Sequence, residues 1–95
     1  MNVELFDGKY RVKFNHDSAD KWTTASLLKL GDNTEELIHV AGAHCHWKDN
    51  FSRKTGRKIA LARLLDWMSN NRFNLTKEDR QKIWEQYFVE FKNSK

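Results

Sequence analysis

The sequence predicts an α+β domain in which an antiparallel meander of three strands is followed by two α-helices packed on one face of the sheet. In the first half of the chain, apolar and polar residues alternate with period two, which is typical of strands with one buried face. In the second half, apolar residues recur at three- and four-residue spacing, which is typical of amphipathic helices. Strands that all precede the helices indicate α+β rather than a parallel α/β sheet.

The first strand is predicted over about residues 9–14, where Tyr10, Val12 and Phe14 alternate with basic residues. Asp7-Gly8, just before it, favours the positive φ angles of a tight hairpin turn. Such a turn would make the segment from Val3 to Phe6 a fourth, short strand. The polar residues 15–21 after the first strand predict a loop.

The next two strands are predicted over about residues 22–30 and 36–47, which are separated by a polar turn. Gly42 within the later strand indicates a bulge or a close approach of another group to the backbone. Strict alternation over 36–47 places one set of side chains on a common face: Leu37, His39, Ala41, Ala43, Cys45 and Trp47.

The two helices are predicted over about residues 52–68 and 77–92. Asp49, Ser52 and Thr55 are alternative N-caps of the first, and Thr76 with Asp79 resembles a capping box at the start of the second. The second helix carries an aromatic stripe that we expect to pack on the sheet, although an exposed stripe would suit a homodimer. Its members are Tyr87, Phe88 and Phe91.

Length and composition limit the class of protein. The 95 residues form a single domain, 1–95, and the one cysteine excludes an intramolecular disulfide. No apolar run approaches the roughly 18–20 residues of a membrane span. The N-terminal segment lacks the basic and apolar regions of a signal peptide, so we expect a cytoplasmic protein without a membrane partner.

Positive charge is concentrated in residues 48–63. This segment holds six basic residues against Asp49 alone, whereas the rest of the chain holds 11 basic and 12 acidic residues. A local excess of cations predicts docking of an anionic partner, and a helix N-terminus among them would suit phosphate. The predicted nucleic-acid or anion site consists of Lys48, Arg53, Lys54, Arg57, Lys58 and Arg63.

Basic residues of the first strand and aromatic residues beside the basic segment would join this site if they faced the same surface. Lys9, Arg11 and Lys13 would extend it if the first strand turned its polar face to the same side. Trp47 and Phe51 flank the basic segment and would stack on bases if exposed, although core positions are the commoner role of such residues. No known base-reading motif is recognisable, so we predict binding to the phosphate backbone of DNA or RNA without base readout.

Two other interpretations of the basic segment remain open. The cations could be a solvated helix face, or they could contact an acidic surface on another protein. The second interpretation predicts an inhibitor or modifier of a host protein rather than a nucleic-acid-binding protein.

The consecutive residues His44, Cys45 and His46 raise the question of an enzyme or a metal site. His44 and His46 project from one strand face, but zinc normally takes three or four ligands. A cysteine nucleophile needs its base beside it, and adjacent strand residues point to opposite faces. We therefore expect no catalytic activity, no metal and no cofactor, with Cys45 a small buried residue.

The run from Cys45 to Arg63, which includes Lys48-Asp49, Phe51, Arg53-Lys54 and Gly56-Arg57, resembles a family of small uncharacterised proteins encoded by bacteriophages and prophages. The later segment from Ile83 to Tyr87 shares the resemblance, which covers about half of the chain. It implies a phage accessory protein that acts in the cytoplasm of a bacterial host, and it implies no particular activity.

Overall fold

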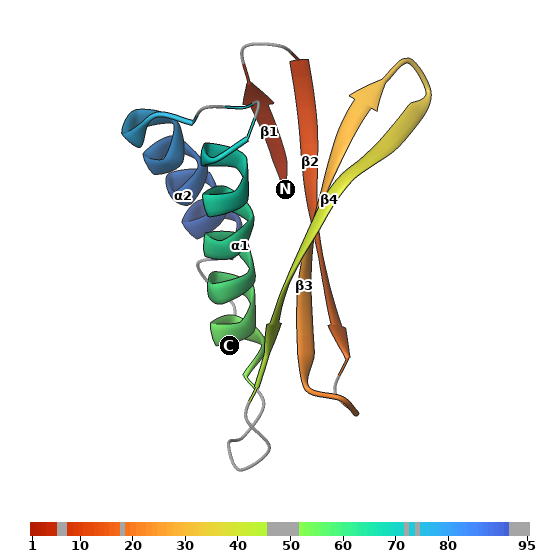
Figure 1. Cartoon of the computed structure of the whole chain (residues 1–95), viewed down its shortest axis with the longest axis vertical. Helices are drawn as coiled ribbons and strands as arrows, with labels where there is room; N and C mark the ends of the chain where they lie inside the picture. Colours follow the sequence, from red (N-terminus) through yellow and green to blue (C-terminus); the bar gives the residue numbers. More distant parts are fainter. Residues whose placement is uncertain (6–7, 18, 46–51, 72, 74, 92–95) are drawn as a thin grey trace.

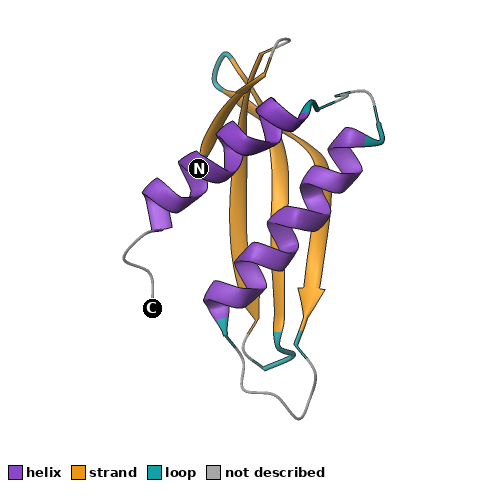
Figure 2. Ribbon diagram, turned by 90° about the vertical axis from the view of Figure 1, so that its left-hand side faces the viewer, coloured by secondary structure: helices purple, strands orange, loops and turns teal. Residues whose placement is uncertain are grey.

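The computed structural model describes residues 1–5, 8–17, 19–45, 52–71, 73 and 75–91. Its strands and helices, in chain order, are β1 (Asn2–Leu5), β2 (Gly8–Asp17), β3 (Trp22–Gly31), β4 (Thr34–His44), α1 (Arg53–Ser69) and α2 (Lys77–Phe91). The strands form one antiparallel sheet in the order β1-β2-β3-β4, so the predicted α+β meander is confirmed. Both helices lie on the same side of the sheet (Figures 1 and 2). We call the opposite side, which no described helix covers, the outer face.

β1 confirms the fourth strand. It pairs antiparallel with the first residues of β2, and Leu5 lies opposite Gly8. Gly8 is therefore a residue of β2, with φ +148°, rather than a turn residue as predicted. Asp7, the other residue of the predicted turn, lies outside the described residues.

β2 is longer than predicted. The polar segment that we interpreted as a loop continues the strand to Asp17, because Asn15, His16 and Asp17 pair with the first three residues of β3. His16 faces the helices, and its Nδ1 lies 3.0 Å from Oγ1 of the buried Thr23. A polar pair can thus continue the strand where the apolar pattern stops.

The core lies between the sheet and the helices. Tyr10, Val12 and Leu27 project from the strands into it and are almost fully buried. α1 covers them with one face, which consists of Ala60, Leu61, Leu64, Leu65 and Met68. Burial of this apolar area, at roughly 25 cal/mol per Å² removed from water, is the main force that holds α1 on the sheet.

A bulge changes the predicted faces of β4. Leu27 lies opposite His39, whereas its neighbour Leu28 lies opposite Leu37, so Ile38 is an extra residue in β4. Leu37 consequently lies on the outer face and is 58% exposed, and its predicted place with the inward-facing residues was wrong. Ile38 packs against the core instead.

Gly42 is a site of close approach, as predicted, and not the site of the bulge. A Cβ on this residue would lie 3.2 Å from Cζ3 of Trp22. The glycine therefore allows the indole of Trp22 to lie against β4 on the outer face.

The two helices begin at the predicted positions. Ser52 is the N-cap of α1, and its hydroxyl accepts the N–H of Thr55 at 3.3 Å. At the start of α2 the Thr76 hydroxyl accepts the Asp79 N–H, and the Asp79 carboxylate accepts the Thr76 N–H, which confirms the capping box. No helix in the described part of the chain is long and apolar enough to cross a membrane.

The aromatic stripe of α2 is only partly buried. Tyr87 is 1% exposed and packs with Phe91 against Phe14 of β2. Phe88 is 49% exposed, so its predicted burial against the sheet was wrong. Its position in the helix turns it away from the sheet, and Lys58 of α1 lies over its ring instead.

Gly56 sets the position of α1 at the end of the sheet. A Cβ at this residue would lie 2.2 Å from Oγ1 and 2.9 Å from Cβ of Thr23. Thr23 is fully buried and its hydroxyl contacts His16, so it cannot move away easily. The first turn of α1 therefore lies directly against β3 because residue 56 has no side chain.

We predict that Gly56→Ala lowers the free energy of unfolding by about 1–2 kcal/mol, because overpacking outweighs the gain of up to about 1 kcal/mol in helix propensity. Urea titration of the wild type and the variant measures this change. The same substitution in a Thr23→Ala background should cost less, since the contact is then relieved. An equal cost in both backgrounds would show that this contact does not limit the approach of α1.

Candidate nucleic-acid interface

The first turn of α1 presents two exposed cations, Arg53 and Lys54. It contains no acidic residue. The amides at a helix start lack partners within the helix and carry the positive end of the helix dipole. The Ser52 hydroxyl takes up the Thr55 N–H, and no carboxylate of the first turn itself competes for the two cations, which are exposed to an anion from solvent. Arg53 and Lys54 are thus the residues of the predicted site that the structure leaves exposed at the helix start.

Asp66 is the acidic residue of α1, and it lies near the other end of the helix. Its carboxylate accepts a hydrogen bond from Arg80 of α2 at 2.9 Å. It therefore ties the two helices together and does not neutralise the cations of the first turn.

Arg57 and Lys58 have different roles from the two residues before them. Arg57 is only 6% exposed, and its guanidinium carbon lies 4.6 Å from the centre of the Phe91 ring. Lys58 is half-buried, with Nζ 5.6 Å from the centre of the Phe88 ring. Both side chains contact aromatic rings of α2 and help to hold the helices together. Of the four cations of the predicted site that lie between residues 53 and 58, the structure leaves Arg53 and Lys54 exposed.

Arg63 lies apart from this cluster. It is ten residues beyond Arg53 in the same helix, which corresponds to about 15 Å along the axis. Its Nη1 donates to the carbonyl oxygen of Gly42 at 2.6 Å. This bond joins α1 to β4, an edge strand of the sheet, so Arg63 has a structural role.

The predicted extension through β2 does not form one surface with α1. Lys9, Arg11 and Lys13 project from the outer face, on the other side of the sheet from the helices. Arg11 and Lys13 both pair with the carboxylate of Glu35, the latter at 3.1 Å. Lys9 lies 4.0 Å from Glu4. The condition on which the extension depended is therefore not met.

Some candidate residues fall outside the described part of the chain. These are Lys48, Trp47, Phe51 and His46.

The other histidines and the cysteine lie in separate surroundings. The His39 ring is stacked on Trp67 of α1, with ring centres 4.0 Å apart, whereas His44 is exposed on the outer face. Cys45 is half-buried, and its backbone N–H donates to the Lys21 carbonyl at 2.8 Å. Within the described residues, no three histidine, cysteine or acidic side chains lie close enough to hold one metal ion.

His16 is a residue of this region that we did not predict. Burial lowers the pKa of its imidazole below the usual 6.5, and the charges of Arg57 and Arg53 lower it further. His16 contacts Thr23, which lies against Gly56, so the ring is close to the start of α1. Extending the alternation of Tyr10, Val12 and Phe14 by one more step would have indicated its inward position.

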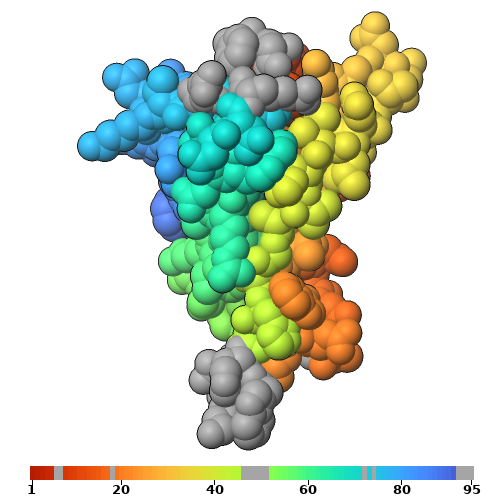
Figure 3. All heavy atoms as spheres, in the orientation of Figure 1, coloured from red at the N-terminus to blue at the C-terminus, as the bar shows by residue number. Residues whose placement is uncertain are grey.

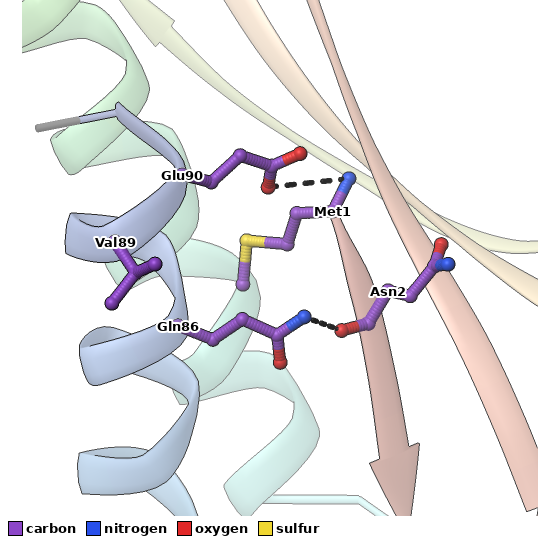
Figure 4. Close-up of a pocket in the computed structure, with 5 residues that line it drawn as sticks. All are labelled: Met1, Asn2, Gln86, Val89 and Glu90. Atoms are coloured by element: carbon purple, nitrogen blue, oxygen red, sulfur yellow. Dashed lines mark hydrogen bonds and ion pairs between the residues drawn. The ribbon is translucent and has the colours of Figure 1, made fainter. Parts of the chain in front are cut away.

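A separate hollow of about 430 Å³ lies between the N-terminal residues and α2 (Figure 4). Its polar groups are engaged with each other: Glu90 lies 3.6 Å from the Met1 amino group, and Gln86 donates to the Asn2 carbonyl. Val89 supplies an apolar wall. None of the described residues in its lining is an arginine or a lysine, so the first turn of α1 remains the candidate interface.

We predict that Arg53→Gln raises the pKa of His16, because one of the two positive charges that oppose its protonation is removed. NMR titration of the imidazole measures this change. Lys58→Gln is the matched control, since Lys58 contacts Phe88 instead, and it should leave the His16 titration unchanged. An Arg53→Gln protein with an unaltered His16 pKa would contradict the effect of the Arg53 charge on this ring.

The same shift gives the sign of a pH effect on stability. Because the folded state holds His16 with a lowered pKa, the unfolded chain binds more protons just below pH 6.5. The contribution of neutral His16 to the free energy of unfolding is complete above this pH. It is lost as the pH falls through the lowered pKa of His16.

Comparisons of the chain with protein-family models, with curated proteins and with solved structures found no match.

Proposed function

We propose that this protein acts by binding nucleic acid, with phosphates docked on Arg53 and Lys54 at the start of α1. The observation that carries the proposal is the pair of exposed cations in a helix turn without an acidic residue. Arginine binds phosphate oxygens through two parallel hydrogen bonds, and lysine adds a point charge. Those N–H groups of the helix start that the Ser52 hydroxyl does not cap would add further donors.

The proposed contacts are with the phosphate backbone and carry no sequence information by themselves. We therefore propose binding to DNA or RNA without base-specific readout, without catalysis and without a cofactor. The resemblance to small bacteriophage proteins supports an accessory role in the cytoplasm of a bacterial host, and this role is part of the proposal.

We predict that the double substitution Arg53→Ala/Lys54→Ala weakens binding to duplex DNA and reduces the slope of log affinity against log salt by about 2, because two phosphate contacts are lost. Fluorescence anisotropy with labelled DNA and RNA, between about 50 and 200 mM salt, measures both quantities. Arg57 is left intact because it is buried against Phe91, and its loss would confuse binding with stability.

The matched control is Lys77→Ala/Lys82→Ala on α2. Both lysines are exposed, and the first turn of this helix contains Glu78 and Asp79. This control removes the same two positive charges from the protein. Because Lys77 and Lys82 lie outside the proposed site, their loss should lower the affinity for DNA only slightly. Equal losses in the two double variants would mean that the start of α1 is not a specific docking site.

The outer face favours a second candidate function, the inhibition or modification of a host protein. Leu37 and Val40 of β4 are 58% and 43% exposed on this face. Half-buried Leu28 of β3 lies directly opposite Leu37, and Arg11 of β2 lies opposite Leu28 on the other side. Arg11 at the border of this apolar strip already pairs with Glu35, so the strip suits an apolar surface on another protein.

We predict that, on this second function, the wild-type protein captures one stoichiometric partner from nuclease-treated host lysate and that Leu37→Glu/Val40→Glu does not. The new carboxylates would disrupt the apolar contact. Size-exclusion chromatography with light scattering then separates a host partner from a second copy of this chain. Recovery of nothing beyond nucleic-acid-dependent contaminants would contradict the second function.

A further inference from the structure

Trp22 is an exposed aromatic residue at the first position of β3, where it projects from the outer face. Its side chain is 43% exposed, yet it is held in place. The absence of a side chain at Gly42 lets the indole lie against β4, and the His44 ring lies 4.7 Å from it, centre to centre, at 39°. The exposed part of the indole is therefore presented to solvent in a fixed position.

This ring lies at the same end of the molecule as the proposed phosphate site. Thr23, the residue after Trp22, is the one that Gly56 of the first turn of α1 contacts. In Figure 1 the start of β3, the end of β4 and the start of α1 meet at the lower end. In Figure 3 the orange, yellow-green and green atoms of these segments lie close together there. Trp22 and Arg53 are thus on opposite faces of the same end of the sheet.

The charged residues near this end of the sheet favour a base on the outer face and a phosphate on the helix-covered face. Asp17 of β2 lies directly opposite Trp22, and its carboxylate accepts the N–H groups of Ala19 and Asp20 at 3.1 Å. A carboxylate beside the indole disfavours a phosphate at that position. Arg53 and Lys54, on the helix-covered side, favour one.

From this arrangement we propose that Trp22, supported by His44, stacks on an unpaired base of a single-stranded nucleic acid. The strand passes around the end of the sheet, so that its phosphates lie on Arg53 and Lys54. This inference rests on the proposed function and adds a substrate class to it, single-stranded rather than duplex nucleic acid. In a duplex the base faces are already stacked, whereas every unpaired base offers a free face to an aromatic ring.

The test compares a labelled oligonucleotide of about 12 nucleotides with the duplex of the same sequence. Trp22→Ala should weaken binding of the single strand about tenfold and leave binding of the duplex unchanged. Trp22→Phe should retain most of the affinity because its ring can still stack. Unlabelled single strand should quench tryptophan emission in the wild type more than in Trp22→Phe, which reports contact at this ring directly.

Leu37→Ala is the matched control, since Leu37 is an exposed apolar residue at the other end of the outer face. It should bind both nucleic acids as the wild type does. Thermal unfolding of each variant establishes that the fold is retained.

The outcomes separate the two proposals. If Trp22→Ala binds the single strand normally while Arg53→Ala/Lys54→Ala does not, the stacking site is wrong and the phosphate site stands. If the wild type binds neither single strand nor duplex at low salt, the proposed function is wrong and the stacking site with it. Equal weakening of single-strand and duplex binding by Trp22→Ala would also overturn the stacking site.

Discussion

The contact between Gly56 and Thr23 is the constraint on which the functional end of this molecule depends. A glycine in the first turn of α1 allows the helix backbone to reach the sheet, where a Cβ would lie 2.2 Å from the Thr23 hydroxyl oxygen. Thr23 in turn contacts His16 of β2, so three elements meet at one buried point. The helix start and its exposed cations are thereby fixed relative to the ends of β2 and β3.

This contact also explains why neighbouring cations of α1 differ in role. A helix that lies against a sheet and beside another helix must bury part of its surface. Arg57 falls on the buried part, against Phe91, whereas Arg53 and Lys54 fall on the exposed part. The proposed phosphate site is therefore smaller than the run of basic residues in the sequence, because some of these residues form contacts within the fold instead.

The two faces of the sheet offer different chemistry. On the helix-covered face, the inward-facing residues of the strands and the buried residues of the two helices form an ordinary apolar core. The outer face combines exposed Trp22 at one end with Leu37 and Val40 toward the other, and Glu35 holds two of its cations. Its end near α1 suits a nucleic-acid base, and its apolar strip suits a protein. One small sheet thus carries the observations behind both candidate functions.

The sequence by itself determined the type and order of the elements. Alternation in Tyr10, Val12 and Phe14, and helical spacing after Ser52, depend on local geometry that each segment shows without its partners. Helix caps are equally local, so the capping box at Thr76 was predicted correctly and Ser52 was among the three residues proposed to cap α1. The concentration of positive charge in one segment is also a property of sequence alone.

Only the tertiary structure decided which of these residues face solvent. The bulge at Ile38 depends on pairing with β3, and it moved Leu37 to the outer face. The roles of Arg57 and Arg63 depend on Phe91 and on the Gly42 carbonyl, which are distant in the chain. Trp22 became a candidate ligand contact only because Gly42 and His44 lie beside it. The physical reason is that exposure is set by packing between remote segments, which no local pattern encodes.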